Sequence, residues 1–145
     1  MEYRELGRTA ERVSILGFGG TGVGMRNYLS EFDPEEMAEA SARAMTRAVE
    51  LGVNYFDTAA LYGKGASERL FGKALATHRE DIFLATKVRA SRADAVRRSV
   101  DESLERLQTD RIDLLQYHGE WITDGIYDDI MKSGGALDGL RAAQA

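Results

Sequence analysis

The sequence of 145 residues contains no cysteine and a single proline, Pro34. Without cysteine the chain can form no disulfide bond, no thiolate metal site and no cysteine nucleophile. It also lacks a run of the roughly 18 apolar residues that a membrane-spanning helix needs. Its first residues, MEYRELGRT, contain no apolar core of a signal peptide. We therefore expect a soluble, cytoplasmic protein.

Charge of one sign is not concentrated anywhere in the chain. The formal net charge is −5, the isoelectric point is about 5.1, and lysine and arginine are scattered along the sequence. A basic face is typical of nucleic-acid-binding proteins, and basic clusters are typical of proteins that dock on anionic lipid. The sequence therefore predicts no nucleic-acid partner and no membrane partner.

Four nearly continuous apolar runs predict strands of a parallel sheet covered on both faces. They cover residues 13–18, 53–56, 82–86 and 112–117. A helical pattern follows each run, and these patterns cover residues 33–51, 67–76, 91–108 and, in part, 137–143. The alternation predicts an α/β fold of four parallel β/α units. The segments YREL and ERVS, around a turn at residues 7–10, predict a short β-hairpin before them.

The ends of the expected helices carry capping signals. Asp33 and Pro34 suit the N-cap and first position of the first helix, and Gly52 suits its C-cap. Ser91, with Asp94 three residues later, suits the start of the third helix. Residues 121–132 show no regular pattern, so we expect a long surface loop there.

Gly17, Gly19 and Gly22 match the G-x-G-x-x-G pattern of dinucleotide-binding folds, directly after the first strand. In those folds the pattern opens into a helix, and an acidic residue follows about 20 residues later. Here the next helix signal is at Asp33, and Asp57 lies 57 − 22 = 35 residues beyond Gly22. We therefore favour a glycine loop at the mouth of a barrel, where backbone approaches substrate or cofactor. The Rossmann alternative predicts a helix just after Gly22 and a flat open sheet.

Polar residues close three successive predicted strands. Asp57 follows VNYF, Lys87 follows IFLAT, His118 follows LLQY, and Tyr62 lies on the loop beyond Asp57. The carboxyl ends of parallel strands meet at one rim, where neighbouring strands lie about 5 Å apart. Each residue alone is more typical of a cap, a solvated charge, a rim aromatic or a structural histidine. Their shared rim position favours a functional site.

These four groups suit the reduction of a carbonyl. Tyr62 is the expected proton donor, because the ammonium of Lys87 would favour loss of the phenol proton. Asp57 would hold Lys87 in place, and His118 would orient the carbonyl and support the charge that develops on its oxygen. His78 is expected on a surface loop at the opposite end of the sheet. The two histidines could not share a metal ion, so we predict no metal site.

The same residues carry a resemblance to a known family. The stretches LGRTAERVSILGFGG, GVNYFDTAALYGKGASERLFGKAL, FLATKV and DRIDLLQYHG resemble the N-terminal half of an aldo-keto reductase. The resemblance implies a (β/α)8 TIM barrel that uses NADPH or NADH to interconvert alcohols with aldehydes or ketones, sugars among them. It implies catalytic roles for Asp57, Tyr62, Lys87 and His118. It also implies cofactor contacts at Gly20, Thr21, Gly22 and Asp57.

The chain departs from the family in its length. A complete barrel has eight strands and about 250 residues, whereas residues 1–145 predict one incomplete domain with four strands. By the resemblance, most cofactor-binding groups belong to the second half of the barrel. Two hypotheses therefore stay open. The chain is a nicotinamide-dependent oxidoreductase of a small carbonyl or sugar substrate, or a truncated, inactive fragment that forms a homo-oligomer through its unpaired first and fourth strands.

Overall fold

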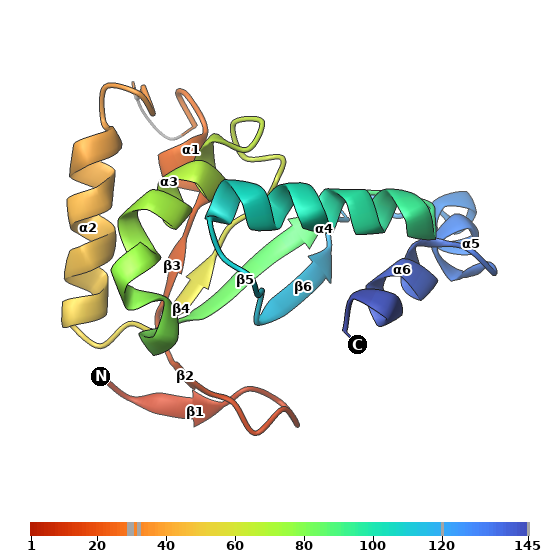
Figure 1. Ribbon diagram of the computed structural model, residues 1–145, viewed down its shortest axis with the longest axis horizontal. Coiled ribbons are helices and arrows are strands. Elements are labelled where there is room, and N and C mark those ends of the chain that lie inside the picture. The colour runs from red at the N-terminus through yellow and green to blue at the C-terminus, as the bar shows by residue number, and fades with distance from the viewer. Residues whose placement is uncertain (29–30, 32, 120, 145) are drawn as a thin grey trace.

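A computed structural model of the chain describes residues 1–28, 31, 33–119 and 121–144. A small antiparallel hairpin precedes a four-stranded parallel sheet (Figure 1). The hairpin strands are β1 (Tyr3–Glu5) and β2 (Arg12–Ser14). The sheet has the order β3–β4–β5–β6, with β3 (Gly17–Gly19), β4 (Tyr55–Asp57), β5 (Phe83–Val88) and β6 (Leu114–Tyr117). Neighbours in the sheet are therefore also neighbours in the chain, as in the first half of a barrel.

Helical segments connect the strands and follow the last one. They are α1 (Thr21–Gly24), α2 (Ala38–Glu50), α3 (Ala66–Leu75), the 3₁₀ helix η1 (Ala76–Asp81), α4 (Ala93–Leu107), α5 (Asp124–Met131) and α6 (Ala136–Ala143). Among the residues described, none of these helices is long and apolar enough to cross a membrane.

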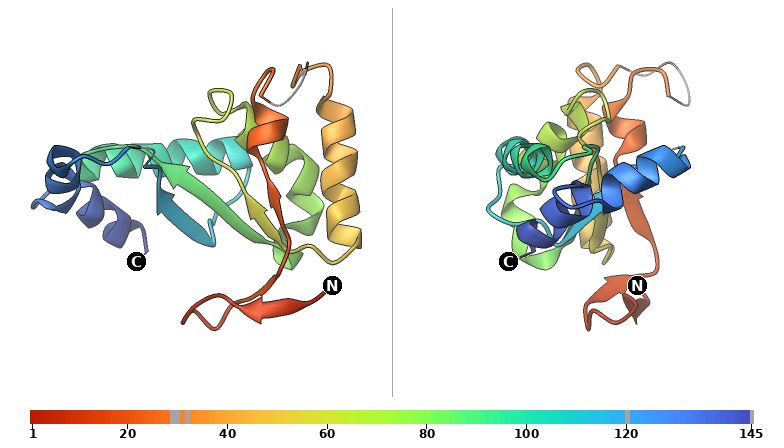
Figure 2. Two further views of the ribbon diagram at one scale, coloured as in Figure 1. Left: turned by 180° about the vertical axis from the view of Figure 1, so that it is seen from behind. Right: turned by 90° about the vertical axis from the view of Figure 1, so that its right-hand side faces the viewer.

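Helices α2, α3 and α4 lie on one face of the sheet, and the view from behind shows the strands uncovered (Figure 2). Successive side chains of a strand point to opposite faces. On the helix side, one core joins α2, α3 and the sheet, and a smaller one joins β5, α4 and α6. The first contains Met45, Phe56, Phe71, Leu75, Ile82, Leu84 and Leu107, and the second Val88, Val96 and Ala136.

The opposite face carries Tyr55, Asp57, Phe83 and Lys87. The rings of Tyr55 and Phe83 stack with centroids 5.6 Å apart and planes inclined by 17°. Tyr55 and Asp57 are half-buried, and helices α2, α3 and α4 lie on the other face of the sheet (Figure 2). The prediction of strands covered on both faces is therefore corrected for the described residues, because their helices lie on one face only, although Phe83 and Ala85 of β5 are buried on the other.

The hairpin and the glycine cap of the first helix are confirmed, and two predicted helix starts are wrong. Gly52 follows α2 with φ +87°, a conformation that favours glycine. Helix α2 begins at Ala38, because Asp33 instead stabilises a separate turn, its Oδ1 accepting from the Glu35 amide at 2.9 Å. Helix α4 begins at Ala93 without a side-chain cap, so Ser91 does not cap it.

Three further expectations are corrected by the structure. The predicted strand 13–18 is divided into β2 and β3, and the linking residues Ile15 and Leu16 are 50% and 62% exposed. The segment 121–132 contains helix α5, whose N-cap Thr123 accepts a hydrogen bond from the Ile126 amide. Helix α1 begins at Thr21, well before the first helix that the sequence predicts.

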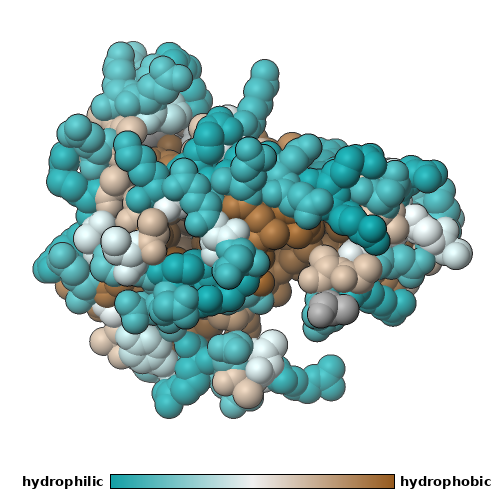
Figure 3. Space-filling model, viewed as in Figure 1, coloured by the Kyte–Doolittle hydropathy of each residue, from teal (hydrophilic) through white to brown (hydrophobic). Residues whose placement is uncertain are grey.

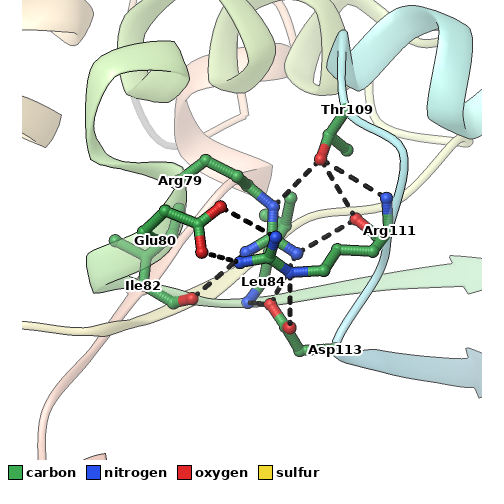
Figure 4. A network of polar contacts seen from close by, with 7 residues as sticks. All are labelled: Arg79, Glu80, Ile82, Leu84, Thr109, Arg111 and Asp113. Carbon is green, nitrogen blue, oxygen red and sulfur yellow. Dashed lines mark hydrogen bonds and ion pairs between the residues drawn. The ribbon is translucent and has the colours of Figure 1, made fainter.

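A polar network fixes the amino ends of β5 and β6 (Figure 4). Arg79, only 12% exposed, donates hydrogen bonds to Thr109 Oγ1 at 3.1 Å and to the carbonyl oxygens of Ile82 and Arg111 at 3.2 and 3.0 Å. It also pairs with Asp113 at 2.8 Å. The network lies at the end of the sheet opposite to Asp57 and Lys87, so it stabilises the fold rather than building a site.

Arg111 also pairs with Glu80 on the surface of this network. Its two terminal nitrogens donate to the two carboxylate oxygens, both at 2.8 Å. These hydrogen bonds, and then the positive charge, hold the pKa of Glu80 below its ordinary value. The same pair raises the pKa of Arg111.

Candidate active site

The carboxyl ends of the strands bring the predicted rim residues to one place. Asp57 is the last residue of β4, Lys87 is the residue before the end of β5, and His118 directly follows β6. The amide of His118 donates to the carbonyl of Val88 at 2.8 Å, so the pairing of β5 and β6 continues past the end of β6. Each side chain therefore projects from a backbone that the sheet holds in register.

Asp57 and Lys87 form a hydrogen-bonded ion pair. Lys87 Nζ lies 2.5 Å from Asp57 Oδ2 and also donates to the carbonyl of Thr58 at 2.8 Å. The side chain of Lys87 is 14% exposed and that of Asp57 27% exposed. A partly buried pair is screened less by solvent than a surface pair. The lysine is therefore held by the last residue of β4 and by the first residue of the loop that follows it.

Tyr62 lies between the lysine and the histidine. Lys87 Nζ is 5.2 Å from the centroid of the Tyr62 ring, within the range of a cation–π contact. The rings of Tyr62 and His118 meet edge to face, with centroids 5.6 Å apart and planes inclined by 85°. The structure thus brings together an acid, an amine, a phenol and an imidazole.

A second tyrosine, Tyr55, lies below this group on the same face of the sheet. Burial, and then the negative charge of Asp57, raise the pKa of Tyr55 above its ordinary value. Tyr55 therefore stays a neutral phenol at neutral pH. Its ring stacks on Phe83 rather than lying against Lys87, so its surroundings differ from those of Tyr62.

Gln116 is a site residue that the sequence reasoning missed. It is the register partner of Lys87 on β6, and its Nε2 donates to Asp57 Oδ1 at 3.1 Å. Two residues before His118, it points to the same face of the sheet as the rim group. That spacing is the signal in the sequence, although Gln116 stands inside the apolar run 112–117.

Gly20, between β3 and α1, and Gly24 at the end of α1 pack against the start of helix α3. The Ser67 hydroxyl donates to the carbonyl of Gly20 at 2.9 Å and accepts from Thr58 Oγ1 at 2.8 Å. A Cβ at Gly20 would lie 2.5 Å from Ser67 Oγ, and one at Gly24 would lie 2.4 Å from Ser67 Cβ. These two glycines are therefore needed for close packing between α1 and α3. By contrast, Gly22 has open space around it.

Helix α1 begins inside the glycine pattern, at Thr21, and has only four residues. A dinucleotide-binding fold has helices on both faces of its sheet, and its strand order reverses at a switch point. The order β3–β4–β5–β6 shows no reversal among the described residues, and the helices lie on one face. The structure therefore does not agree with the Rossmann alternative. The predicted glycine loop is also corrected, because Gly17 and Gly19 lie in β3 and Gly22 lies in α1.

A buried carboxylate connects the rim to the outer helices. Glu68 is fully buried on α3, accepts a hydrogen bond from Thr86 Oγ1 at 2.6 Å and pairs with Arg106 Nε at 2.6 Å. Arg106 lies on α4 and also donates to Ser103 at 3.1 Å. Thr86 precedes Lys87 in β5, so Glu68 fixes the strand segment that presents the lysine.

A pocket of about 240 Å³ opens beside His118. Its wall combines the rings of Tyr117 and Trp121 with the polar side chains of Arg89 and Asp129. Trp121 is 85% exposed. The pocket is thus an accessible place for a small molecule next to the imidazole.

The described residues hold no group of three or more histidine, cysteine, aspartate or glutamate side chains able to bind a metal ion. His78 is half-buried and lies in the mostly exposed helix η1 rather than on the predicted loop. It is close in sequence to Arg79 and the network at the amino ends of the strands, away from His118.

The four-stranded half of a barrel, with these residues at its rim, corresponds to a family of known proteins. The chain matches the family model described as the aldo/keto reductase family over residues 15–140. It belongs to that family. It is 43% identical over 142 residues to the L-galactose dehydrogenase of Arabidopsis thaliana, a match that covers 91% of this chain and 42% of that protein.

Solved structures give the same result for the fold. An aldo-keto reductase from Bacillus halodurans, in its holo form, is 39% identical with a TM-score of 0.74, over 90% of this chain and 44% of that one. An aldo/keto reductase from Klebsiella pneumoniae in complex with NADP and acetate is 26% identical with a TM-score of 0.63, over 82% and 41%. A glycerol dehydrogenase from Gluconobacter oxydans is 28% identical with a TM-score of 0.69, over 85% and 40%.

These matches confirm the predicted family and the predicted half-barrel fold. They also show that the chain spans less than half the length of these relatives.

Proposed function

We propose that the chain supplies the catalytic residues of a nicotinamide-dependent oxidoreductase that interconverts carbonyl compounds and alcohols. The observation that carries the proposal is the position of Tyr62, with Lys87 Nζ 5.2 Å from its ring centroid and the His118 ring at its edge. Membership of the aldo/keto reductase family supports the same class of reaction.

In this proposal Tyr62 donates a proton to the carbonyl oxygen during reduction. Negative charge develops on the phenol oxygen as the proton leaves, and the nearby ammonium of Lys87 stabilises it. Asp57 holds Lys87 in place through the 2.5 Å hydrogen bond. His118 hydrogen-bonds to the carbonyl oxygen and so orients the substrate.

The nicotinamide cofactor would supply the hydride in reduction and accept it in oxidation. We propose that NADPH or NADH contacts this chain at Gly20, Thr21, Gly22 and Asp57. Two observations fit a ligand there. A Cβ at Gly22 would meet nothing within 4 Å, and the Gly20 amide donates to the Asp57 carbonyl at 2.7 Å, so the end of β3 lies beside the carboxyl end of β4. The Klebsiella relative solved with NADP supports this class of cofactor.

The pocket beside His118 is the proposed substrate site. An aromatic side chain with polar groups around it suits a small polyhydroxylated molecule, and here Trp121 stands near Arg89 and Asp129. The names of two relatives, an L-galactose dehydrogenase and a glycerol dehydrogenase, support a sugar or polyol. The cytoplasmic location and the absence of nucleic-acid and membrane partners stay predictions from the sequence.

The test is carbonyl reduction by the wild-type chain and by Tyr62→Phe, each alone and each fused to the second half of the barrel of the Arabidopsis relative. General acid catalysis contributes about 10²–10⁴-fold, so we expect the variant to lose at least about 100-fold in kcat/KM. Tyr127→Phe removes the hydroxyl of an exposed tyrosine on α5 and is the matched control. Equal activity of Tyr62→Phe and wild type contradicts the proposal.

The strand edges favour a second candidate, a truncated, inactive half-barrel that self-associates. Within the described residues, β3 and β6 each pair with one neighbour only, and an unpaired edge is a template for another strand. A groove of about 330 Å³ flanks β6, lined in part by Leu114, Leu137 and Leu140. Figure 3 shows a hydrophobic area on this side of the molecule, below α4.

Two measurements on the isolated chain decide between the candidates. Fluorescence titration measures NADPH binding, and sedimentation measures the mass of the particle. A dimer that does not bind NADPH supports the second candidate, and Leu140→Glu should then dissociate it whereas the exposed control Leu51→Glu should not. A monomer, or micromolar binding of NADPH, contradicts it.

A further inference from the structure

Each carboxylate oxygen of Asp57 has its own donor, and the two donors come from different strands. Oδ2 accepts from Lys87 Nζ on β5 at 2.5 Å, and Oδ1 accepts from Gln116 Nε2 on β6 at 3.1 Å. Lys87 and Gln116 are register partners, so both side chains start from the same level of the sheet. Gln116 therefore reaches across β5 to a carboxylate on β4, and the three strands are joined at the rim.

The second donor restricts the rotation of the Asp57 side chain. With a single donor, the carboxylate could turn about its Cβ–Cγ bond and present either oxygen to Lys87. With Gln116 on Oδ1, only Oδ2 remains for the ammonium, which is also fixed by the carbonyl of Thr58 at 2.8 Å. The position of the Lys87 charge relative to the Tyr62 ring therefore depends on Gln116 as well as on Asp57.

The amide is chemically suited to this position because it donates a hydrogen bond without adding charge. A lysine or arginine here would compete with Lys87 for the carboxylate of Asp57. A glutamate would repel that carboxylate and attract the ammonium away from it. An apolar residue would leave Oδ1 of a partly buried carboxylate without this partner, which is unfavourable.

We propose that Gln116 is a positioning residue of the active site, which fixes the carboxylate of Asp57 so that the Lys87 ammonium stays beside Tyr62. The assignment rests on the proposed oxidoreductase function. Gln116 touches the ion pair rather than substrate or cofactor, so its loss should lower the rate of the chemical step and leave substrate binding nearly unchanged.

The experiment compares Gln116→Met, which keeps the length of the side chain but not the donor, with Gln144→Met, the same change at an exposed position on the C-cap of α6. Steady-state kcat and KM are measured for the wild type and both variants, in the barrel fusion described above. We expect Gln116→Met to lose about tenfold in kcat, with KM changed by less than about twofold, and Gln144→Met to match the wild type. Gln116→Glu should lose more activity than Gln116→Met.

The result also separates this inference from the proposed function. If the wild type is active and Gln116→Met keeps its kcat, or changes only in KM, the inference is overturned while the function stands. If the wild type is inactive, the contact is tested by urea unfolding of Gln116→Met, Asp57→Ala and the double variant. Additive changes in the unfolding midpoint then overturn the inference, whereas coupled changes support a shared interaction.

Discussion

The hydroxyl of Ser67 donates a hydrogen bond to the carbonyl of Gly20 across 47 positions of the sequence, at 2.9 Å. This bond joins the first turn of α3 to the residue that links β3 and α1. Thr58, next to Asp57, donates to the same hydroxyl at 2.8 Å. One serine therefore joins Gly20, which we propose contacts the cofactor, to the residue next to Asp57, which we propose is catalytic.

The close approach at this point predicts a difference between two glycines of α1. Gly24→Ala would place a Cβ 2.4 Å from Ser67 Cβ and 2.9 Å from its Cα, and overpacking of this kind costs about 1–3 kcal/mol of the free energy of unfolding. Gly22→Ala meets nothing within 4 Å and should be neutral or slightly stabilising. Urea unfolding monitored by circular dichroism measures both. Equal effects of the two substitutions would mean that α1 does not pack on Ser67 as described.

The buried ion pair of Glu68 and Arg106 predicts a large effect of removing one charge. Glu68→Gln removes the negative charge that pairs with the partly buried guanidinium of Arg106 at 2.6 Å, and breaking a buried ion pair costs up to about 3–5 kcal/mol. The control Glu39→Gln breaks an exposed pair with Arg43 in α2, which should cost about 0–1 kcal/mol. Chemical denaturation of both variants gives the comparison. Similar small losses in the two would show that Glu68 is not held as an ion pair.

The Glu80–Arg111 pair predicts a dependence of stability on acid pH. Because the pKa of Glu80 is lower in the folded chain than its ordinary value of 4.5, its contribution is present above that value and is lost as pH falls through the folded pKa. We expect Glu80→Gln and Arg111→Gln each to weaken the acid dependence of the free energy of unfolding relative to wild type. Urea unfolding at a series of pH values below about 5 measures it. An unchanged dependence in both variants would contradict the pairing.

The sequence predicted the parallel strands and the major helices because their apolar periodicity reflects the core on the helix side. It did not predict α1, since the segment TGVG has little helical propensity and becomes helical where it packs on Ser67. It also missed α5, a helix of eight residues without a fully buried side chain, in which Ile130 packs only in part against the second core. Asp33 misled the assignment of α2 because its carboxylate stabilises a turn and pairs with Arg26.

The site could be predicted as far as it follows from strand ends. Asp57, Lys87 and His118 meet because neighbouring parallel strands end at the same rim, and Tyr62 joins them from the next loop. Gln116 could not be found in this way, because its partner lies two strands away and the pairing appears only when the register of β5 and β6 is known. The roles of all five residues in catalysis stay proposals, and the variants above test those of Tyr62 and Gln116.

Among the described residues, the sheet has helices on one face and no helix on the other (Figure 2), and this affects how strongly the charges on the uncovered face attract one another. Water that reaches the bare side raises the effective dielectric around Asp57 and Lys87, and attraction between charges falls in proportion. Any polypeptide that covers this face, from the same molecule or another, would exclude water from the Asp57–Lys87 ion pair. The attraction between these charges, and that between Lys87 and the Tyr62 ring, would then be stronger. The strength of the Asp57–Lys87 ion pair therefore depends on whether other polypeptide covers this face of the sheet.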